Sequence, residues 1–419
     1  MTGPLVGIRI ITFTQAWAGT SATELLAFLG ADVIQIESRT HPDIWRGGYA
    51  GEVPPGVRDE SRRQRKWNTA AAYNSVNLNK RAITLDVADE RGRALFRRLV
   101  PLADVIADNF TPAVMRKWGL DYDSLRAIRP DIIAASLSAY GATGPLRDVR
   151  GIGGTLEPMS GLTSLLGYEG GRPMNSGSMI PDPIAGAWFA AAIVTAIRHR
   201  SRTGEGQYID LGMMEATAMM AGDAVLEFTA NGRVRARTGN RHPRIAPHGT
   251  YEARDGRWLA LCADDEEQWR ALARLIGDPT LLDAARFATQ ESRKLHEVDL
   301  DARIALWAGT QDAEAAEVLL LAAGVPAARV RSREELLKHP ALLARGFAVE
   351  VDHPEAGRRT VAGAPWVMSR TQPEVTRPAP MLGEHSLEVF QELLDMDRGE
   401  YEELVALGIS GDGPPDGQD

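Results

Sequence analysis

Hydrophobic residues in the first half of the chain follow two alternating patterns. Short apolar runs of about four to eight residues predict buried strands, at 6–13, 31–37, 81–87, 104–107, 131–137 and 207–211. Stretches with apolar positions at helical spacing predict helices, at 19–29, 90–100 and 186–200. Strands that alternate with helices of this length are typical of crossover connections. The sequence therefore predicts an α/β fold with a parallel sheet covered on both faces.

The pattern changes near residue 222, which predicts a second and smaller domain. Residues 249–261 resemble a β-hairpin with Asp255 and Gly256 at its turn, and helical spacing dominates over 266–323. Two short strands and a helical stretch follow, at 347–351, 359–362 and 386–407. We expect a large domain, a small α+β domain and a disordered tail, comprising residues 1–222 with 331–410, 223–330 and 411–419 respectively.

Composition excludes several classes of protein. The 419-residue chain is 44% hydrophobic and 25% charged, and its net charge of −9 argues against general nucleic-acid binding. The single cysteine, Cys262, excludes a disulfide within the chain and a cysteine-based zinc site. The eight histidines show no H-x-x-x-H pairing, so we expect no metal. The N-terminus does not resemble a signal peptide, and no apolar stretch reaches about 18 residues. We therefore expect a cytoplasmic protein without a membrane partner.

Nucleotide-binding motifs are missing where a parallel sheet would carry them. Ligands bind beyond the carboxyl ends of the strands, yet residues 12–20, after the first predicted strand, lack G-x-G-x-x-G. Glu37 lies where a ribose-binding acid would, but this spacing alone is weak evidence. Neither a Walker A sequence nor a G-x-S-x-G elbow occurs. We therefore reject a nicotinamide cofactor.

Asp182 stands between two prolines, before an apolar stretch. The rings of Pro181 and Pro183 restrict the backbone around it. Residues 187–199 are mostly apolar, which predicts a buried helix with a partly desolvated carboxylate at its amino end. Such an aspartate either caps the helix, since Asp is a preferred N-cap residue, or takes part in chemistry. The local pattern alone favours the cap.

Eight stretches in a fixed order resemble the family III CoA-transferases. This family contains the formyl-CoA:oxalate and carnitine CoA-transferases, with the α-methylacyl-CoA racemases as a related branch. Each stretch is modest alone, but together they cover the chain from residue 5 to residue 385. They lie at 5–13, 29–37, 77–86, 103–110, 138–145, 179–186, 200–207 and 382–385.

The resemblance implies that Asp182 is the aspartate nucleophile of the family. CoA would then move from an acyl-CoA thioester to a free carboxylic acid through an aspartyl mixed anhydride and an aspartyl-CoA thioester, which is covalent catalysis by a carboxylate. The resemblance also implies a Rossmann-like large domain and an intertwined homodimer. No permanently bound cofactor is implied, because coenzyme A is a substrate.

The CoA groove can be carried over residue by residue. The resemblance implies that it is lined by Gln15, Ala16, Trp17, Ala18, Arg39, Leu85, Asn109, Phe110, Lys117, Tyr140 and Met213. Lys117 replaces a frequent phosphate-binding arginine, and Arg39 is expected to substitute for a basic residue that is usual at the position of Ser38. For four basic residues both phosphate binding and ordinary surface charge remain open, namely Arg39, Arg46, Lys80 and Lys117.

Two departures from the family pattern bear on the substrate. Trp17 replaces a glutamine that lies near the active carboxylate of the oxalate enzyme, which favours a bulkier or more apolar acyl group. Residues 237–249 stand where some members carry a glycine-rich loop. This segment either lines the acceptor pocket or ties the linker to the sheet, and the sequence supports both interpretations equally.

Two alternative functions compete with CoA transfer. An α-methylacyl-CoA racemase needs a histidine as its second base, but apolar Ile152 stands at that position. The sequence therefore favours the transferase. A non-catalytic acyl-CoA-binding protein would have no need of Asp182, and its presence argues against that alternative.

Overall fold

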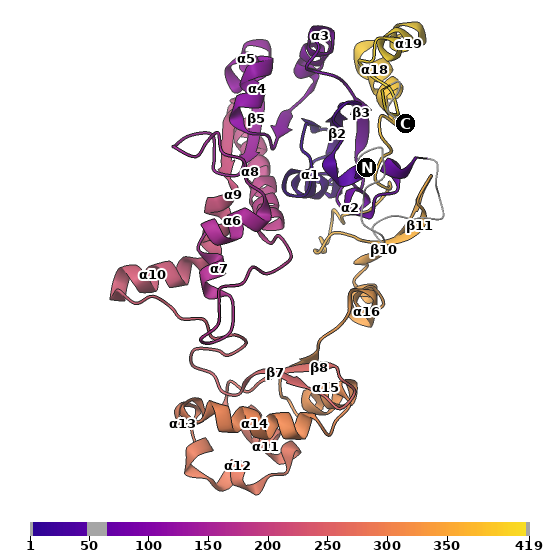
Figure 1. Ribbon diagram of the computed structural model, residues 1–419. Helices are drawn as coiled ribbons and strands as arrows, with labels where there is room; N and C mark the ends of the chain where they lie inside the picture. The colour runs from indigo at the N-terminus through magenta and orange to yellow at the C-terminus, as the bar shows by residue number, and fades with distance from the viewer. Residues whose placement is uncertain (1–2, 48–64, 416–419) are drawn as a thin grey trace. The chain divides into compact units, whose positions relative to one another are not determined.

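The structure is a computed structural model that describes residues 3–47 and 65–415, and the chain separates into two compact units (Figure 1). The larger unit comprises Met1–Leu162, Asn175–Val225 and Leu337–Asp419. The smaller unit comprises Thr163–Met174 and Leu226–Leu336. A short loop inside the predicted large-domain range is thus grouped with the smaller unit.

The larger unit is built on a six-stranded sheet in the order β3-β2-β1-β4-β5-β6. Every neighbouring pair of strands is parallel, which confirms the predicted parallel sheet. The order reverses between β1 and β4, and a doubly wound sheet binds ligands at such a switch point. The strands are β1 (Arg9–Thr12), β2 (Asp32–Glu37), β3 (Arg81–Thr84), β4 (Val105–Asp108), β5 (Ile133–Ser138) and β6 (Tyr208–Gly212).

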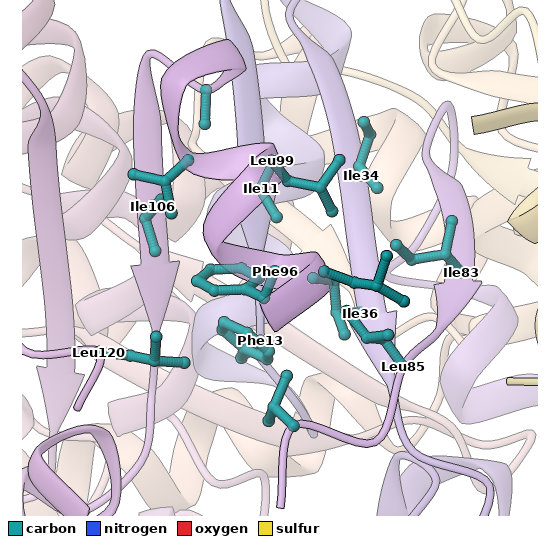
Figure 2. Packing of buried hydrophobic residues seen from close by; sticks show 14 of the residues in the cluster. Ile11, Phe13, Ile34, Ile36, Ile83, Leu85, Phe96, Leu99, Ile106 and Leu120 are labelled. Carbon is teal, nitrogen blue, oxygen red and sulfur yellow. The ribbon is translucent and has the colours of Figure 1, made fainter. Parts of the chain in front are cut away.

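Helices cover both faces of this sheet because its strands are apolar on both sides. On one face Ile10 packs in a cluster with α1 (Ala18–Phe28), α6 (Gly153–Met159), α8 (Pro181–Thr203) and α9 (Met213–Ala218). On the other face the cluster includes α3 (Glu90–Leu99), α4 (Pro112–Trp118), α5 (Tyr122–Ile128) and α18 (Ser386–Leu394). Figure 2 shows Phe96 and Leu99 of α3 lying over side chains of the sheet, among them Ile11, Phe13 and Ile36.

Helix α8 differs from its predicted form in two ways. It begins at Pro181 rather than at residue 186, which places Asp182 in its first turn. It also has an exposed face, where the Trp188 side chain is 46% exposed. The predicted burial therefore holds for only one face, which carries Phe189, Ile193 and Ile197, whereas Ala187, Trp188 and Ala191 are exposed on the other.

The smaller unit combines a three-stranded sheet with helices. Strands β7 (His248–Glu252) and β8 (Trp258–Cys262) form the predicted antiparallel hairpin, with Gly256 in the left-handed region at its turn (φ 75°). A short third strand, β9 (Ala327–Arg329), pairs with β8 and was not expected. The core lies between this sheet and α11 (Glu266–Ile276), α14 (Glu297–Ala308) and α15 (Ala313–Ala322).

The C-terminal part of the larger unit adds further elements. Strands β10 (Ala348–His353) and β11 (Gly357–Ala362) form a separate antiparallel pair, and α19 (Arg398–Ala406) follows α18. Residues 411–415 of the predicted tail are described, whereas 416–419 lie outside the described residues. Within the described ranges, none of the helices combines the length and the apolar character that a bilayer crossing requires.

Candidate active site

Asp182 lies in the first turn of α8 but does not cap that helix. The N-cap residue is Ile180, Pro181 occupies the first turn, and no side chain makes a capping hydrogen bond. The interpretation of Asp182 as a helix cap is therefore wrong. Its backbone N–H donates to the carbonyl of Met179 (3.1 Å). The helix dipole stabilises a negative charge at this end.

The Asp182 carboxylate lies where the amino ends of three helices meet. Ala18 is the first residue of α1, Gly153 is the first residue of α6, and Asp182 is in the first turn of α8. Burial raises the pKa of Asp182 to about 6, while the backbone N–H groups of Asp182 itself, Ala18 and Gly153 act in the opposite direction. The side chain is therefore mostly ionised at neutral pH although it is largely removed from water.

Close packing around Asp182 depends on two glycines. A Cβ atom at Gly153 would lie 2.1 Å from Asp182 Oδ2, so no side chain fits there. A Cβ atom at Gly186 would lie 2.7 Å from the carbonyl oxygen of Ala18, so this glycine lets α8 approach α1. Asp182 Oδ2 is buried, and it has no hydrogen-bond partner of normal geometry among the described residues. A partly desolvated carboxylate oxygen without a partner is suited to act as a nucleophile.

The loops that follow β1 and β4 are joined at the switch point of the sheet. Asn109 accepts a hydrogen bond from the N–H of Gln15 and donates one to its carbonyl, both at 2.8 Å. Ala16 adopts the left-handed conformation (φ 59°), and its N–H donates to Asp43 Oδ1 (2.9 Å). The ring of Trp17 lies 5.5 Å from that of Trp45 between centroids. Sequence reasoning missed Asp43, because nothing in its local sequence indicates this contact.

All predicted CoA-binding residues except Lys117 lie just beyond the carboxyl end of a strand in the large sheet. These are Gln15 to Ala18 after β1, Arg39 after β2, Leu85 after β3, Asn109 and Phe110 after β4, Tyr140 after β5 and Met213 after β6. The Leu85 side chain is buried in the core, whereas Lys117 is exposed on α4. Phe110 packs edge-on against Trp118 at 5.7 Å. The shared edge is the one where a doubly wound sheet binds its ligands.

The four basic residues left open by the sequence have different environments. The Arg39 guanidinium donates to the carbonyls of residues in the C-terminal segment, namely Ser410, Gly413 and Pro414. Arg46 and Lys80 are fully buried, so the alternative of surface charge is wrong for both. Lys80 Nζ donates to the carbonyl of Thr20 (2.8 Å), and burial lowers the Lys80 pKa to about 7. Both residues therefore hold the fold together behind the predicted groove.

Residues 237–249 lie in the smaller unit and contact the loop 163–174 of the same unit. The N–H of Gly239 donates to the carbonyl of Gly167 (2.9 Å), and Arg237 Nη2 donates to that of Gly171 (2.7 Å). Further along, Asn240 Nδ2 donates to Thr250 Oγ1 of β7 (2.7 Å). The segment thus connects this loop to the small sheet. His242 and His248 of this segment line a cavity of about 630 Å³ together with Cys262 of β8.

Comparison with known proteins identifies the family. Residues 5–386 match the model of CoA-transferase family III. A succinyl-CoA–D-citramalate CoA-transferase from Chloroflexus aurantiacus is 32% identical over 97% of this chain and 98% of the relative. A succinate–glutarate CoA-transferase from Agrobacterium fabrum is 34% identical over 94% and 97%, respectively. The crystal structure of a CAIB/BAIF family protein from Brucella suis superposes with a TM-score of 0.84, at 30% identity over 94% of this chain and all of that one. The chain belongs to the family III CoA-transferases and is an enzyme that transfers CoA between an acyl-CoA and a carboxylic acid.

Proposed function

We propose that the enzyme transfers CoA through covalent intermediates on Asp182. The buried, unpartnered Oδ2 of this residue is the observation that supports the proposal. The carboxylate attacks the thioester carbonyl carbon of the donor, the C–S bond breaks, and CoA leaves as a thiolate beside an aspartyl mixed anhydride. The thiolate then attacks the Asp182 carbonyl carbon, which gives an aspartyl-CoA thioester and releases the donor acid as a carboxylate. The acceptor carboxylate reverses these steps.

The surroundings of Asp182 favour these steps electrostatically. Both the nucleophile and the tetrahedral intermediates carry negative charge on oxygen. The backbone N–H groups of Ala18 and Gly153, at the amino ends of α1 and α6, are fixed close to the carboxylate before any substrate binds. Fixed N–H donors of this kind stabilise an oxyanion without reorganising during the reaction.

CoA is proposed to bind along the carboxyl edge of the large sheet. Support comes from the linked loops at the switch point, where Asn109 holds Gln15. Lys117 is exposed and has room to bind a phosphate as a point charge. Arg39 can contribute only where a phosphate replaces the carbonyls of the C-terminal segment that accept its hydrogen bonds.

We propose succinyl-CoA as donor and a five-carbon dicarboxylic acid as acceptor. This proposal rests on the two relatives that match nearly the whole chain, a succinyl-CoA–D-citramalate and a succinate–glutarate CoA-transferase. Trp17 alone favoured a bulkier or more apolar acyl group, but similarity along the whole chain outweighs one position. A panel of acceptors incubated with succinyl-CoA, including glutarate, citramalate and long-chain monocarboxylates, tests the choice by formation of the new thioester.

Neither alternative function gains support from the site. Ile152 is the N-cap residue of α6, directly before Gly153, and its apolar side chain is 63% exposed. An isoleucine cannot exchange the α-proton of an acyl-CoA, so a racemase would lack its second base. A purely binding protein would have no use for an ionised carboxylate with a buried, unpaired oxygen, because burial of that charge is unfavourable.

Chemical trapping separates the three functions. The enzyme is incubated with succinyl-CoA, treated with hydroxylamine and digested for mass spectrometry. A transferase yields an aspartyl hydroxamate at Asp182, a racemase instead incorporates solvent deuterium at the α-carbon of the acyl group, and a binding protein does neither. Absence of the hydroxamate in an enzyme that still transfers CoA contradicts the covalent mechanism.

We also propose that the enzyme is a homodimer, and the family resemblance implies an intertwined one. Support comes from large apolar side chains of the larger unit that lie exposed on α8, on the 3-10 turn Met219–Ala221 and in the first turn of α10 (Gly222–Asn231). They are Trp188, Met219, Met220 and Val225, and Trp188 and Met219 line the same pocket. Exposed apolar side chains that gather in this way mark protein interaction sites. Light scattering after size-exclusion chromatography is expected to give twice the chain mass of 45.5 kDa.

Transfer activity is expected to fall as the pH is lowered through about 6. Burial raises the pKa of Asp182 to about 6, and the protonated carboxylic acid formed below that pH is not nucleophilic. The profile of kcat/KM against pH should therefore show an acidic limb with a slope of about one, which reports the free enzyme. Thermal denaturation at each pH controls for unfolding. Constant activity down to about pH 4 would contradict the assignment of Asp182.

The variant Gly153→Ala is expected to lose activity while it remains folded. The new Cβ atom would lie 2.1 Å from Asp182 Oδ2 and would displace the carboxylate. A shift of the reacting group by about 1 Å lowers the rate by about 100-fold, which steady-state kinetics with succinyl-CoA can measure. Gly154→Ala is the matched control, because a Cβ atom there would meet nothing within 4 Å. Equal activity in the two variants would show that Asp182 does not need this close contact.

A further inference from the structure

The loop that carries Ala18 to the active carboxylate contains an unfavourable backbone conformation. Ala16 has a φ of 59°, which residues with a side chain rarely adopt. Such a conformation is unfavourable for a residue with a side chain, so neighbouring groups must hold it in place. Ala18, whose N–H faces Asp182, follows only two residues later. Ala16 thus lies in the short stretch of backbone that leads to that N–H.

Two side chains from outside the loop hold it. Asn109, after β4, pairs with both the N–H and the carbonyl of Gln15. Asp43, after β2, accepts the N–H of Ala16 on Oδ1 (2.9 Å), and the same oxygen accepts the N–H of Trp45 (2.9 Å). Asp43 thus holds the one residue of the loop that is in the left-handed region.

Asp43 is itself fixed by a buried network. It is fully buried, and its own N–H donates to Glu37 Oε2 (2.9 Å). Glu37 is held in turn by Arg46 (Nη2–Oε1 2.7 Å), and neither side chain is exposed. Asp43 Oδ2 has no hydrogen-bond partner among the residues that the structure describes. A buried carboxyl with one oxygen unpaired is unfavourable, which indicates a role beyond stability.

We propose that Asp43 is a positioning residue for CoA transfer. Its Oδ1 holds Ala16 in the left-handed conformation, and this places the N–H of Ala18 against the Asp182 carboxylate and against the oxyanion that forms there. Asp43 does not touch the substrate and acts only through the loop. This inference rests on the proposed role of Asp182 as nucleophile.

The contact between Asp43 and Ala16 is compatible with either protonation state of the Asp43 carboxyl group. Burial, and to a smaller extent the negative charge of Glu37, raise its pKa to about 7, although the N–H groups of Trp45 and Ala16 and the charge of Arg46 act in the opposite direction. Oδ1 accepts hydrogen bonds in either protonation state, because a proton can reside on the unpaired Oδ2. The contact with Ala16 therefore requires an acceptor oxygen and does not require a charge.

Three variants of the full-length enzyme test the proposal. Asp43→Ala removes the acceptor and is expected to lower kcat with succinyl-CoA by about 100-fold, as expected for a misplaced donor. Asp43→Asn keeps an acceptor oxygen and should restore most of that loss. Adding Ala16→Gly to Asp43→Ala should recover part of the activity, since glycine adopts a positive φ without a side-chain clash. Calorimetry with free CoA should show a much smaller change than kcat, because Asn109 still holds Gln15.

Each outcome of this series has a defined meaning. Wild-type kcat in Asp43→Ala overturns the proposal, and so does an equal loss in Asp43→Asn and Asp43→Ala. Loss that Ala16→Gly does not relieve, with a lowered melting temperature, would show that Asp43 serves only folding and also overturns it. If the wild-type enzyme forms no hydroxamate at Asp182, the proposed covalent mechanism fails instead. The hydroxamate yield of wild-type enzyme is therefore measured first.

Discussion

Asp182→Asn is expected to abolish CoA transfer, with kcat reduced by at least about four orders of magnitude. Loss of a nucleophile removes the covalent route, and an effect of this size is typical of such residues. The amide is nearly isosteric with the carboxylate, so the packing against Gly153 and Ala18 is kept. Transfer is measured as the formation of a new CoA thioester, and mass spectrometry should find no CoA adduct on the variant.

Stability distinguishes this loss from unfolding. The Asp182 pKa is raised from 3.8 to about 6, so ionisation of this group weakens the folded state as the pH rises through that window. Asparagine carries no charge, and the variant should be more stable at neutral pH, by up to about 3 kcal/mol. Asp148→Asn, at an exposed carboxylate that pairs with Arg147, is the control and should match the wild type in both assays. Residual activity in Asp182→Asn within tenfold of wild type would rule out the nucleophile.

Arg46→Met is expected to destabilise the folded enzyme by about 3–5 kcal/mol, since it leaves the buried Glu37 charge without its partner. The guanidinium bonds Glu37 through two nitrogens, Nη2–Oε1 at 2.7 Å and Nε–Oε2 at 2.8 Å, and lies 3.6 Å from the centroid of the Tyr73 ring. Denaturant unfolding, with two-state behaviour checked by more than one probe, measures the change.

A double variant separates the pair from its packing. Glu37→Gln combined with Arg46→Met removes both charges but keeps an amide oxygen for the N–H of Asp43. It should be clearly more stable than Arg46→Met alone, because an uncompensated buried charge is the larger part of the penalty. Arg147→Met, at the exposed pair with Asp148, should change stability little. Equal stability of Arg46→Met and Arg147→Met would show that burial of the Arg46–Glu37 pair has no energetic consequence.

The sheet could be predicted from the sequence because its strands are buried on both faces. Apolar runs such as the one ending at Glu37 are clear signals, and the strands were located to within a few residues. β9 was missed because Ala327, Ala328 and Arg329 carry no pattern that distinguishes a strand from a loop. The start of α8 was missed although Pro181 is a good first-turn residue, because Asp182 is equally typical of a cap.

The site was only partly accessible from sequence. Asp182 and the groove residues came from resemblance to a family, whereas the role of Gly153 depends on a contact with a residue far away in the chain. The burial of Arg46 and Lys80 could not be predicted from the sequence either, because their partners lie on other elements. From sequence alone a charged residue is predicted to be exposed to solvent, because charged residues are rarely buried without a partner. The partner is visible only in the tertiary structure.

The meeting of three helix ends at Asp182 has a consequence for how such enzymes diverge. The dipoles and N–H groups stabilise an ionised carboxylate regardless of whether it next attacks a carbonyl carbon or removes a proton. Gly153 admits no side chain, whereas Ile152 directly before it is the exposed N-cap residue of α6. Under the proposed mechanism the groups that hold the carboxylate are thus fixed by the fold, while the neighbouring position is free to vary without rebuilding it.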